Sequence, residues 1–521
     1  MDFTAAMQGI RPANSKMRWL ICALLFWAFT ANYIDRSVFG NLAPEMPKYL
    51  HLDTRVSDAE ALQYWNQHAG DRELTADLAA QGQTGANLRA NTVAMQIVKM
   101  TAAKKSWSAQ YWYIQMVFAG FFAISTMTMG RLMDVIGLRW GFPITCLIWA
   151  LGSSSQSIAP EIGNLFGNPI YGFYICVALL SLGQGGIFPA AVKATAEWFP
   201  KRERALATGL FNSGSNLGGL LAPWGLPALL LFLSTFTIGG HIIGWRGAFI
   251  PGIVIDVLWI FGWLAIYRKP QLHAKVSEAE LALIHSDGDA VESKIKVPWR
   301  RLLTYRQTWA VTGAKLLTDA YWSFYLFSAP DFFHRKFGLG PADRKYLIMT
   351  IYIVSTIGGI AGGWLSGRFM RAGWSLNKSR KIAMLLCASL VVPVFYAGLT
   401  NSQWVAAALI TMAASGHQAW MANTNNLSSD MFPKKMVGSV MGFAGFVSAF
   451  GMMTVFFVTG KVISVTGNYL PMFIVASMAY PLSVVLVHLL APKLAPANIE
   501  EDQILRNKLH KLGEETLAPI L

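Results

Sequence analysis

Charged residues are scarce in this sequence. Asp, Glu, Lys and Arg make up 14% of the 521 residues, whereas apolar residues make up 54%. A soluble globular protein has roughly 25% charged residues, because its surface has to face water. The shortage excludes a soluble enzyme and a disordered chain, and it predicts a protein whose surface faces lipid.

Cysteine is also rare. Its four copies, Cys22, Cys146, Cys176 and Cys387, lie in apolar stretches, and none has a partner at CxxC spacing. A disulfide framework or a zinc site needs paired or clustered cysteines. We interpret the four as small packing residues. We also find no metal cluster, nucleophile–base pair or glycine-rich phosphate loop, so we expect no metal, no cofactor and no enzymatic activity.

The net charge of +15 does not indicate nucleic-acid binding. The basic residues lie in short patches between long uncharged stretches, and in membrane proteins such patches set the orientation. We therefore expect the lipid bilayer, and not nucleic acid, as a partner.

Long apolar stretches dominate the chain. A helix needs about 20 predominantly apolar residues to cross the hydrocarbon core. The first stretch begins at Trp19 and is too long for a signal-peptide core, so we expect it to stay in the protein. The sequence predicts an all-α membrane protein with twelve transmembrane helices. They cover residues 19–43, 106–130, 140–160, 168–192, 205–233, 247–267, 308–330, 346–367, 382–399, 402–429, 437–460 and 468–490.

The distribution of Lys and Arg predicts that both termini are cytoplasmic, because basic residues concentrate in the loops on the side of the N-terminus. Within the linker, Ser277 and Glu280 predict a capping box that opens a short helix over 278–285. We find no motif in the outer insertion. The expected domains are a six-helix half (1–268, with a polar outer insertion at 44–105), a cytoplasmic linker (269–307), a second half (308–490) and a tail (491–521).

Two pairs of similar segments indicate an internal repeat. Gly130-Arg-Leu-Met-Asp134 resembles Gly363-Trp-Leu-Ser-Gly367, and Glu197-Trp-Phe-Pro200 resembles Asp430-Met-Phe-Pro433; both pairs are 233 residues apart. The equal offsets predict two pseudo-symmetric six-helix halves. A central site between parallel halves is a transporter architecture.

Several motifs along the chain resemble those of one transporter family. They are Gly130-x-x-x-Asp134-x-x-Gly137-x-Arg139, Asn32-Tyr33-Ile34-Asp35-Arg36, Gly185-Gly186-Ile187-Phe188-Pro189, Phe211-Asn212-Ser213-Gly214-Ser215, the stretch from Lys315 to Phe327, and Gly416-His417-Gln418-Ala419-Trp420. With these motifs the chain resembles the major facilitator superfamily, its anion:cation symporter branch, and most of all the bacterial hexuronate transporters.

This resemblance implies a secondary active transporter of the bacterial inner membrane. It would import a sugar-acid anion such as glucuronate or galacturonate, driven by protons, through rocker-switch alternating access. Three alternatives stay open. The substrate is another small organic anion of the galactonate or glucarate type, the coupling is altered or lost, or the protein senses a sugar acid without transporting it.

The first span carries two adjacent charges. A charged residue at the centre of a membrane helix costs roughly 2.5–3.5 kcal/mol, so it normally faces a cavity and has a partner. We expect Arg36 to hold the substrate carboxylate through a bidentate fork, and Asn32, one turn earlier, to bind sugar hydroxyls. Asp35 lies about 100° around the helix, and the resemblance implies that it carries a proton. The alternatives are an outward-pointing Arg36 and a structural ion pair for Asp35.

The seventh span carries Lys315 and Asp319 four residues apart, so the two share a helix face. They form either a self-neutralising pair or a switchable pair in which Lys315 binds the anion and Asp319 the proton. Trp322 continues the same face and would stack on a sugar ring, and Tyr325 follows at the next step.

The resemblance also implies that further polar residues contact the substrate, although in a membrane they can equally hold helices together. Asp134 and Arg139, with Gly130, are expected to form a structural gate at the cytoplasmic helix ends. The expected substrate contacts are Tyr111, Asn212, His417, Gln418 and Asn423.

The fourth span departs from the family pattern. The family usually has a glutamate five residues before Pro189 and an arginine seven residues before that glutamate, whereas this chain has Gln184 and Val177. Glutamine has the shape of a protonated glutamic acid but releases no proton. Gln184 is therefore the position at which coupling is altered, so coupling relies on Asp35 and Asp319 or is absent.

Overall fold

The computed structural model describes residues 16–497, except 44–45, 71, 84–87, 89–90, 234, 236, 239–240, 243, 287–298, 340 and 467. Most of the expected tail at 491–521 and part of the linker therefore lie outside the described residues.

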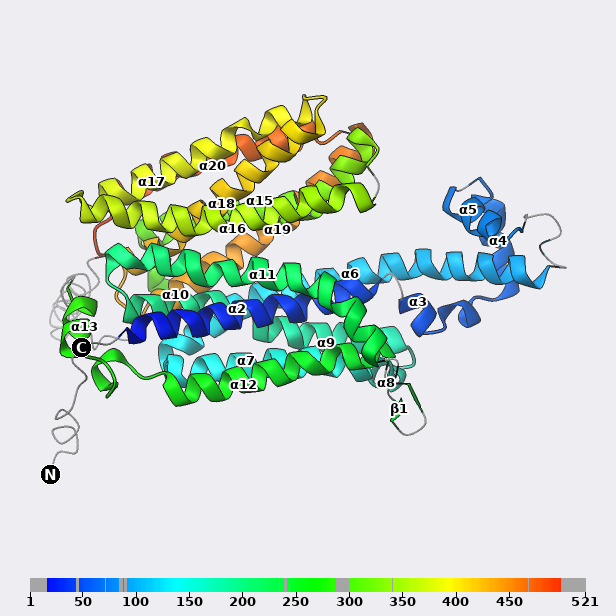
Figure 1. The fold of residues 1–521 in the computed structure, drawn as a ribbon, viewed down its shortest axis with the longest axis horizontal. Coiled ribbons are helices and arrows are strands. Elements are labelled where there is room, and N and C mark those ends of the chain that lie inside the picture. Colours follow the sequence, from blue (N-terminus) through cyan, green and yellow to red (C-terminus); the bar gives the residue numbers. More distant parts are fainter. Residues whose placement is uncertain are drawn as a thin grey trace, which may run out of the picture.

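Twelve transmembrane helices form two bundles that lie one above the other (Figure 1), which confirms the predicted fold class. The first bundle contains α2 (Met17–Leu42), α6 (Thr92–Ile136), α7 (Leu138–Ser155), α9 (Pro169–Gln184) continued by α10 (Ile187–Trp198), α11 (Lys201–Leu233) and α12 (Ile250–Ile266). The second contains α15 (Arg306–Phe337), α16 (Pro341–Arg371), α17 (Leu376–Val391) continued by the 3-10 helix η6 (Val392–Gly398), α18 (Gln403–Met431), α19 (Val437–Thr466) and α20 (Leu470–Leu490).

Short elements connect these helices. They are η3 (Gln156–Ile158), α8 (Ala159–Asn164), η4 (Gly244–Phe249), η5 (Pro270–Leu272), α13 (Glu278–Ile284) and α14 (Trp299–Leu302). The strands of the described residues are β1 (Thr237–Ile238) and β2 (His241–Ile242). They form one antiparallel hairpin that pairs Thr237 with Ile242 and Ile238 with His241.

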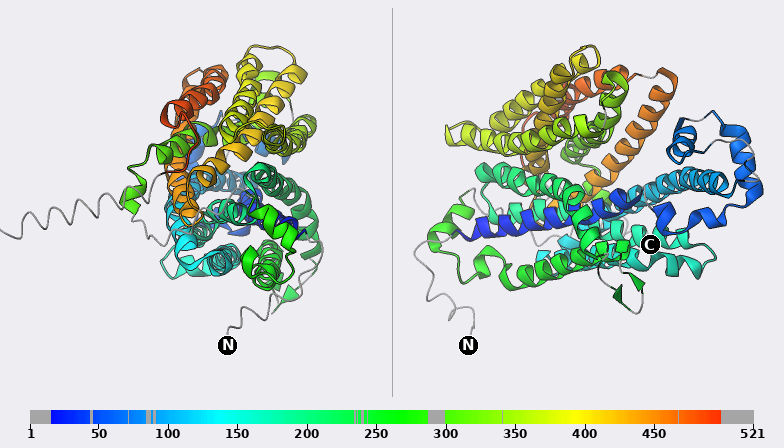
Figure 2. Two further views of the ribbon diagram at one scale, coloured as in Figure 1. Left: turned by 90° about the vertical axis from the view of Figure 1, so that its left-hand side faces the viewer. Right: turned by 45° about the vertical axis from the view of Figure 1, so that its right-hand side comes forward.

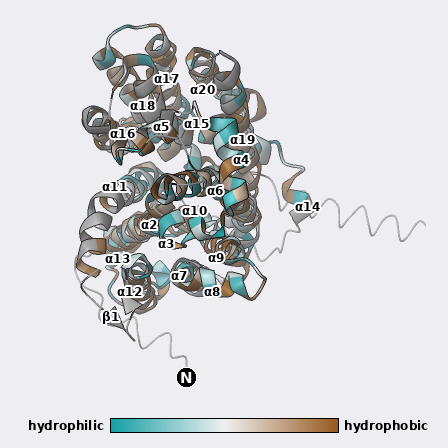
Figure 3. Cartoon of the chain, turned by 90° about the vertical axis from the view of Figure 1, so that its right-hand side faces the viewer, coloured by the Kyte–Doolittle hydropathy of each residue, from teal (hydrophilic) through white to brown (hydrophobic). Residues whose placement is uncertain are grey.

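Large apolar side chains cover the outside of both bundles. Phe261, Trp404 and Phe457 are each about two-thirds exposed, at 67%, 67% and 66%. Figure 3 looks along the bundles from the side of α4 and α5 and shows the two groups of helices one above the other. An apolar exterior of this kind is suited to lipid and not to water.

Eight helical segments of the described chain are long and apolar enough to cross a membrane on length and composition alone. The other transmembrane helices include α15 and α18. In α18 every residue from Gly416 to Met431 is buried, with polar side chains among them. The more polar helices therefore lie inside the bundle, as expected for helices that line a polar centre.

Two glycines interrupt the fourth span. α9 ends at Gln184, and α10 begins at Ile187 after Gly185 and Gly186. A Cβ at Gly185 would lie 2.6 Å from the Cβ of Ser125 on α6, so this stretch packs too closely on α6 for a larger side chain. The break places Gln184 at the end of α9, where its side chain contacts α2.

The outer insertion is a small helical unit and not a featureless loop. It contains α3 (Met46–Tyr49), the 3-10 helix η2 (Leu52–Arg55), α4 (Asp58–His68) and α5 (Arg72–Ala80), packed on the first turns of α6 (Figures 1 and 2). The sequence analysis found no motif in this segment, but Ser57 and Glu60 form a complete capping box at the start of α4. A separate apolar core holds the unit together: Ala61, Leu74, Leu78, Leu88, Ala94 and Val98.

The linker helix α13 anchors the beginning of the first span. The Ser277 hydroxyl accepts a hydrogen bond from the Glu280 backbone N–H at 3.1 Å, as expected of the capping residue. The Glu280 carboxylate also accepts from the backbone N–H groups of Met17 and Arg18, each at 3.1 Å. The Arg18 guanidinium completes this contact at 3.1 Å.

Candidate functional site

Amide side chains from both halves meet at the centre of the molecule. The Asn212 side chain of α11 donates to Gln418 Oε1 of α18 at 2.7 Å, and Gln418 Nε2 donates to Asn216 Oδ1 at 3.1 Å. Asn216 in turn donates to the Thr356 hydroxyl of α16 at 2.8 Å. The sequence therefore named two residues, Asn212 and Gln418, that bind each other directly across the two halves. It missed Asn216, which lies one turn after Asn212 on the same helix.

Lys315 and Asp319 form a partly accessible ion pair on α15. Lys315 Nζ lies 2.7 Å from Asp319 Oδ2, and the side chains are 5% and 18% exposed. Lys315 also donates to Asn425 Oδ1 at 3.3 Å. The second carboxylate oxygen of Asp319 and the amide nitrogen of Asn425 are buried without hydrogen-bond partners. The pair therefore keeps unused hydrogen-bonding capacity.

An aromatic stack lies next to this pair. The rings of Trp322 and His417 are parallel to within 9°, with centroids 5.6 Å apart. Tyr480 Oη lies 2.6 Å from His417 Nδ1, and Tyr352 of α16 meets Trp322 edge-on at 6.5 Å. Tyr325 is 1% exposed and packs against Phe324 at 5.7 Å, inside the aromatic core of the second half.

Arg36 lies against aromatic rings and not against a carboxylate. Its guanidinium carbon is 4.6 Å from the ring centroid of Phe118 and 6.0 Å from that of Phe122, both on α6. Tyr33 and Tyr111 are its other close neighbours. Among the described residues no ion pair involves Arg36. A half-buried guanidinium without an ion pair can bind a carboxylate through two parallel hydrogen bonds.

Asn32 and Gln184 connect α2 with the interrupted fourth span. Gln184 Nε2 donates to the backbone carbonyl of Asn32 at 3.1 Å. The Asn32 side-chain nitrogen and the Gln184 side-chain oxygen are buried without hydrogen-bond partners.

Asp35 turns away from Arg36, as the helical geometry predicts. It is 1% exposed and lies beside Asp256 of α12. The structure therefore does not bring Asp35 together with the polar residues of α15 and α18.

Asp134 joins the two halves on the side of the linker. Its carboxylate binds Lys193 Nζ of α10 at 2.7 Å, and it accepts from both the backbone N–H and the hydroxyl of Ser439 at 2.6 Å. Gly130 lies so close to α19 that a Cβ there would collide with the carbonyl oxygen of Gly438. The Arg139 guanidinium lies 5.9 Å from the Trp140 ring centroid, and no contact found in the described residues joins it to Asp134.

A second linker-side cluster was missed by the sequence analysis. Arg380 and Asp430 form a fully buried ion pair at 2.8 Å, and Arg380 donates to the Lys201 carbonyl of the first half at 3.1 Å. Asn423 accepts from Arg380 at 3.4 Å, so it lies in this cluster and not in the central amide network. Arg204 of α11 donates to the Ser429 carbonyl at 2.8 Å. The signal that could have found the cluster was Asp430, whose repeat partner is Glu197.

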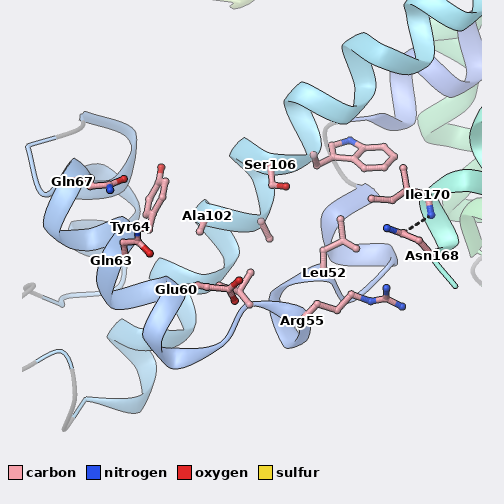
Figure 4. A pocket seen from close by; sticks show the side chains of 13 residues that line it. Leu52, Arg55, Glu60, Gln63, Tyr64, Gln67, Ala102, Ser106, Asn168 and Ile170 are labelled. Atoms are coloured by element: carbon pink, nitrogen blue, oxygen red, sulfur yellow. Dashed lines mark hydrogen bonds between the residues drawn. The ribbon is translucent and has the colours of Figure 1, made fainter.

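A cavity of about 410 Å³ lies between the outer insertion and the ends of α6 and α9 (Figure 4). Leu52, Tyr64, Trp107 and Asn168 are among its lining residues, and none of the predicted site residues lines it. Among the described residues no cluster of three or more His, Cys, Asp or Glu side chains could hold a metal ion.

The chain is similar to known transporters in sequence and in fold. The chain is 26% identical to the hexuronate transporter of Escherichia coli (strain K12) over 395 residues, which cover 75% of this chain and 87% of the relative. It is 28% identical to the galacturonate transporter of Dickeya chrysanthemi over 310 residues, which cover 58% and 84%. Among solved structures, the proton:xylose symporter XylE matches with a TM-score of 0.59 at 14% identity over 94% of this chain and 98% of the other.

The model of one protein family matches most of the chain, and the members of that family are transporters and not enzymes. The matched family is the Major Facilitator Superfamily, and the match covers residues 25–456, so the chain belongs to that superfamily of membrane transporters.

Proposed function

We propose that this protein imports a hexuronate anion, such as glucuronate or galacturonate, together with protons by rocker-switch alternating access. The observation that carries the proposal is one cation in each half, the half-buried Arg36 of α2 and the buried Lys315 of α15. Arg36 has no ion pair among the described residues, and Lys315 has an ion pair that a substrate carboxylate can replace. The similarity to hexuronate and galacturonate transporters supports the same substrate class.

The substrate would lie between the halves. Its carboxylate binds Arg36, whose rigid fork matches a carboxylate with two parallel hydrogen bonds. Lys315 supplies a second cationic contact. The sugar hydroxyls bind the side-chain amides of Asn32, Asn212 and Gln418, which offer both donors and acceptors. Trp322, supported by its stack on His417, provides an apolar surface for the sugar ring.

Charge balance explains how a proton would accompany the anion. When the substrate carboxylate takes Lys315 from Asp319, the Asp319 carboxylate keeps an uncompensated charge, and one of its oxygens is buried without a hydrogen-bond partner. Protonation removes that charge, so anion and proton favour each other's binding. Asp35 is the second proposed proton carrier.

We assign the linker side to the cytoplasm, with both termini there, in the bacterial inner membrane. The described contacts between the halves include those of Asp134, Arg204 and Arg380 on the linker side. This structure then corresponds to a state that is closed towards the cytoplasm. Substrate would enter from the side of the outer insertion.

Gln184 favours a second candidate, an uncoupled hexuronate carrier. Its amide donates to the Asn32 carbonyl as a protonated glutamic acid would, but it never gives up a proton. Such a carrier would equilibrate its substrate across the membrane without concentrating it.

Uptake of radiolabelled glucuronate into proteoliposomes separates the two candidates. Accumulation above the external concentration under an inward proton gradient is expected for the symporter. Equilibration that ignores the gradient would assign the uncoupled carrier. Binding without uptake would contradict both and identify a sensor. A galactonate and a glucarate arm in the same assay test the other sugar acids.

A further inference from the structure

Two carboxylates face each other inside the first half, away from the central amide network. Asp35 of α2 and Asp256 of α12 are neighbours and are 1% and 0% exposed. Gly252, one turn before Asp256, makes this approach possible, because a Cβ at that position would collide with Asp35 Oδ1. The carboxyl group of Asp35 therefore lies directly on the α12 backbone.

The donors that the described residues place beside the pair are neutral. Trp149 Nε1 of α7 donates to Asp256 Oδ2 at 2.7 Å. Ser153 lies beside Asp35, and its buried hydroxyl has no hydrogen-bond partner. Asp35 Oδ2 and Asp256 Oδ1 are also buried without hydrogen-bond partners. An unused hydroxyl and two unused carboxyl oxygens in one place leave room for a proton.

The charged groups on the elements that pack against α2 and α12 have partners other than the two carboxylates. The thiol of Cys146 lies 3.9 Å from the Asp256 carbonyl oxygen. Among the described residues no cation forms an ion pair with Asp35 or Asp256. Two cations on these elements lie against aromatic rings: Arg36 of α2 against Phe118, and Arg139 of α7 against Trp140. The other charged groups pair as follows: Lys193 of α10 with Asp134, Arg204 of α11 with Asp430 and the Ser429 carbonyl, Arg246 of η4 with Glu161, and Arg18 of α2 with Glu203 and Glu280.

We infer that Asp256 and Asp35 together form the proton-carrying site of the first half, and that Asp256 fills the role left empty by Gln184. Two buried carboxylates in contact cannot both be ionised without a large electrostatic cost, so they share one proton. The site cycles between one proton and none: the proton binds a carboxyl oxygen from the outer side and leaves towards the cytoplasm. This inference rests on the proposed proton symport.

The pair can act on the substrate site through α2. Loss of the shared proton leaves two negative charges in contact, so α2 is driven away from α12. Arg36 is the next residue of α2, and Asn32 lies one turn before it. Their positions therefore follow the protonation of the pair, although the pair does not contact the amide network. Asp256 is thus a positioning residue for substrate and a binding residue for the proton.

The first test measures the proton directly and needs no substrate. Infrared difference spectra of the purified protein across a pH titration separate protonated carboxylic acids from carboxylates. We expect the wild-type protein to keep a protonated carboxyl near neutral pH, and Asp256→Asn and Asp35→Asn each to shift its band and the pH at which the band disappears, because each leaves a single carboxyl that no longer shares its proton. Asp58→Asn is the control and should leave the band unchanged, since the Asp58 side chain is 73% exposed and pairs with Lys99. A band and a titration that are unchanged in Asp256→Asn would overturn the inference.

The second test uses glucuronate transport in proteoliposomes. Asp256→Asn keeps an acceptor for Trp149, and we expect it to lose gradient-driven accumulation while retaining counterflow exchange. Gly252→Ala leaves both carboxyl groups in place but pushes them apart, so it should give the same loss if Asp256→Asn does not fold. Accumulation at the wild-type level in both variants would contradict the inference. If the wild-type protein carries no glucuronate, the symport proposal fails, whereas the infrared result still decides on the pair.

Discussion

Adjacent residues on one helix serve different surroundings in this protein. Asp35 and Arg36 were both recognisable in the sequence, because charges are rare in an apolar span. Their separation also followed from helical geometry, which turns neighbouring residues about 100° apart. What could not be predicted was Asp256 as the neighbour of Asp35. The two are far apart in sequence, and one sequence does not reveal which faces of α2 and α12 meet.

Arg36→Lys should weaken glucuronate uptake although the charge is kept. A lysine cannot make two parallel hydrogen bonds to a carboxylate. The loss of one charge-assisted hydrogen bond costs roughly 1.5–3 kcal/mol, or about 10- to 150-fold in KM. Uptake kinetics check this, with the exposed Arg368→Lys as the control. An unchanged KM in Arg36→Lys would remove Arg36 from the substrate site.

Gln184→Glu should add a pH-dependent step. Only a protonated carboxyl can donate to the Asn32 carbonyl as Gln184 does, and an ionised one would be buried beside that carbonyl oxygen. The variant is therefore most stable at low pH and loses this stability as the carboxyl group ionises. Thermal unfolding at several pH values measures this change. Gln156→Glu, at another buried glutamine, is the control. An identical pH profile in both variants would mean that any buried carboxyl group gives this pH dependence and that the contact with Asn32 is not its cause.

The helices were easier to predict from the sequence than the elements that pack against them. Every predicted span coincides with a helix, because about 20 apolar residues are needed to cross the membrane whatever the tertiary packing. The outer insertion was missed as a folded unit because its helices are short and polar on most faces. The close approach of α6 to α19 was likewise hidden, since a glycine in a sequence does not say which backbone lies against it.

Gly130→Ala should disfavour the state closed on the linker side. The added methyl group collides with the Gly438 carbonyl, and overpacking of this kind costs typically about 1–3 kcal/mol. We expect slower transport and faster labelling of cysteines introduced on the linker side. Gly120→Ala on the same helix meets nothing within 4 Å and should behave as the wild type. Equal accessibility in the two variants would show that this contact does not hold the halves together.

The molecule as a whole is held closed on one side by several polar contacts between its halves. Asp134 is the contact best suited to a test, since it connects Lys193 of one half with Ser439 of the other. The repeat in the sequence predicted the two halves. It could not predict which side is closed, because both states of a rocker switch use the same residues.

Asp134→Asn should populate a state in which the linker side is open. In the variant a neutral amide oxygen replaces the carboxylate that accepts two hydrogen bonds from Ser439 across the halves, and charge-assisted hydrogen bonds are roughly twice as strong as neutral ones. The variant also loses the ion pair with Lys193 inside the first half. Spin labels at Val135→Cys and Lys435→Cys report the separation of the halves by pulsed electron resonance. We expect a longer distance component in Asp134→Asn that is weak in the parent. Superimposable distance distributions would rule out a gating role for Asp134.

The long helix α6 runs without a break from the core of the outer insertion to Asp134. Its 45 residues make a rod about 68 Å long at 1.5 Å per residue. When the first half tilts about the linker side, such a rod converts a small rotation there into a wide sweep of the helices of the insertion. An antibody fragment bound to α4 and α5 would therefore slow this tilt without contacting the central amide network.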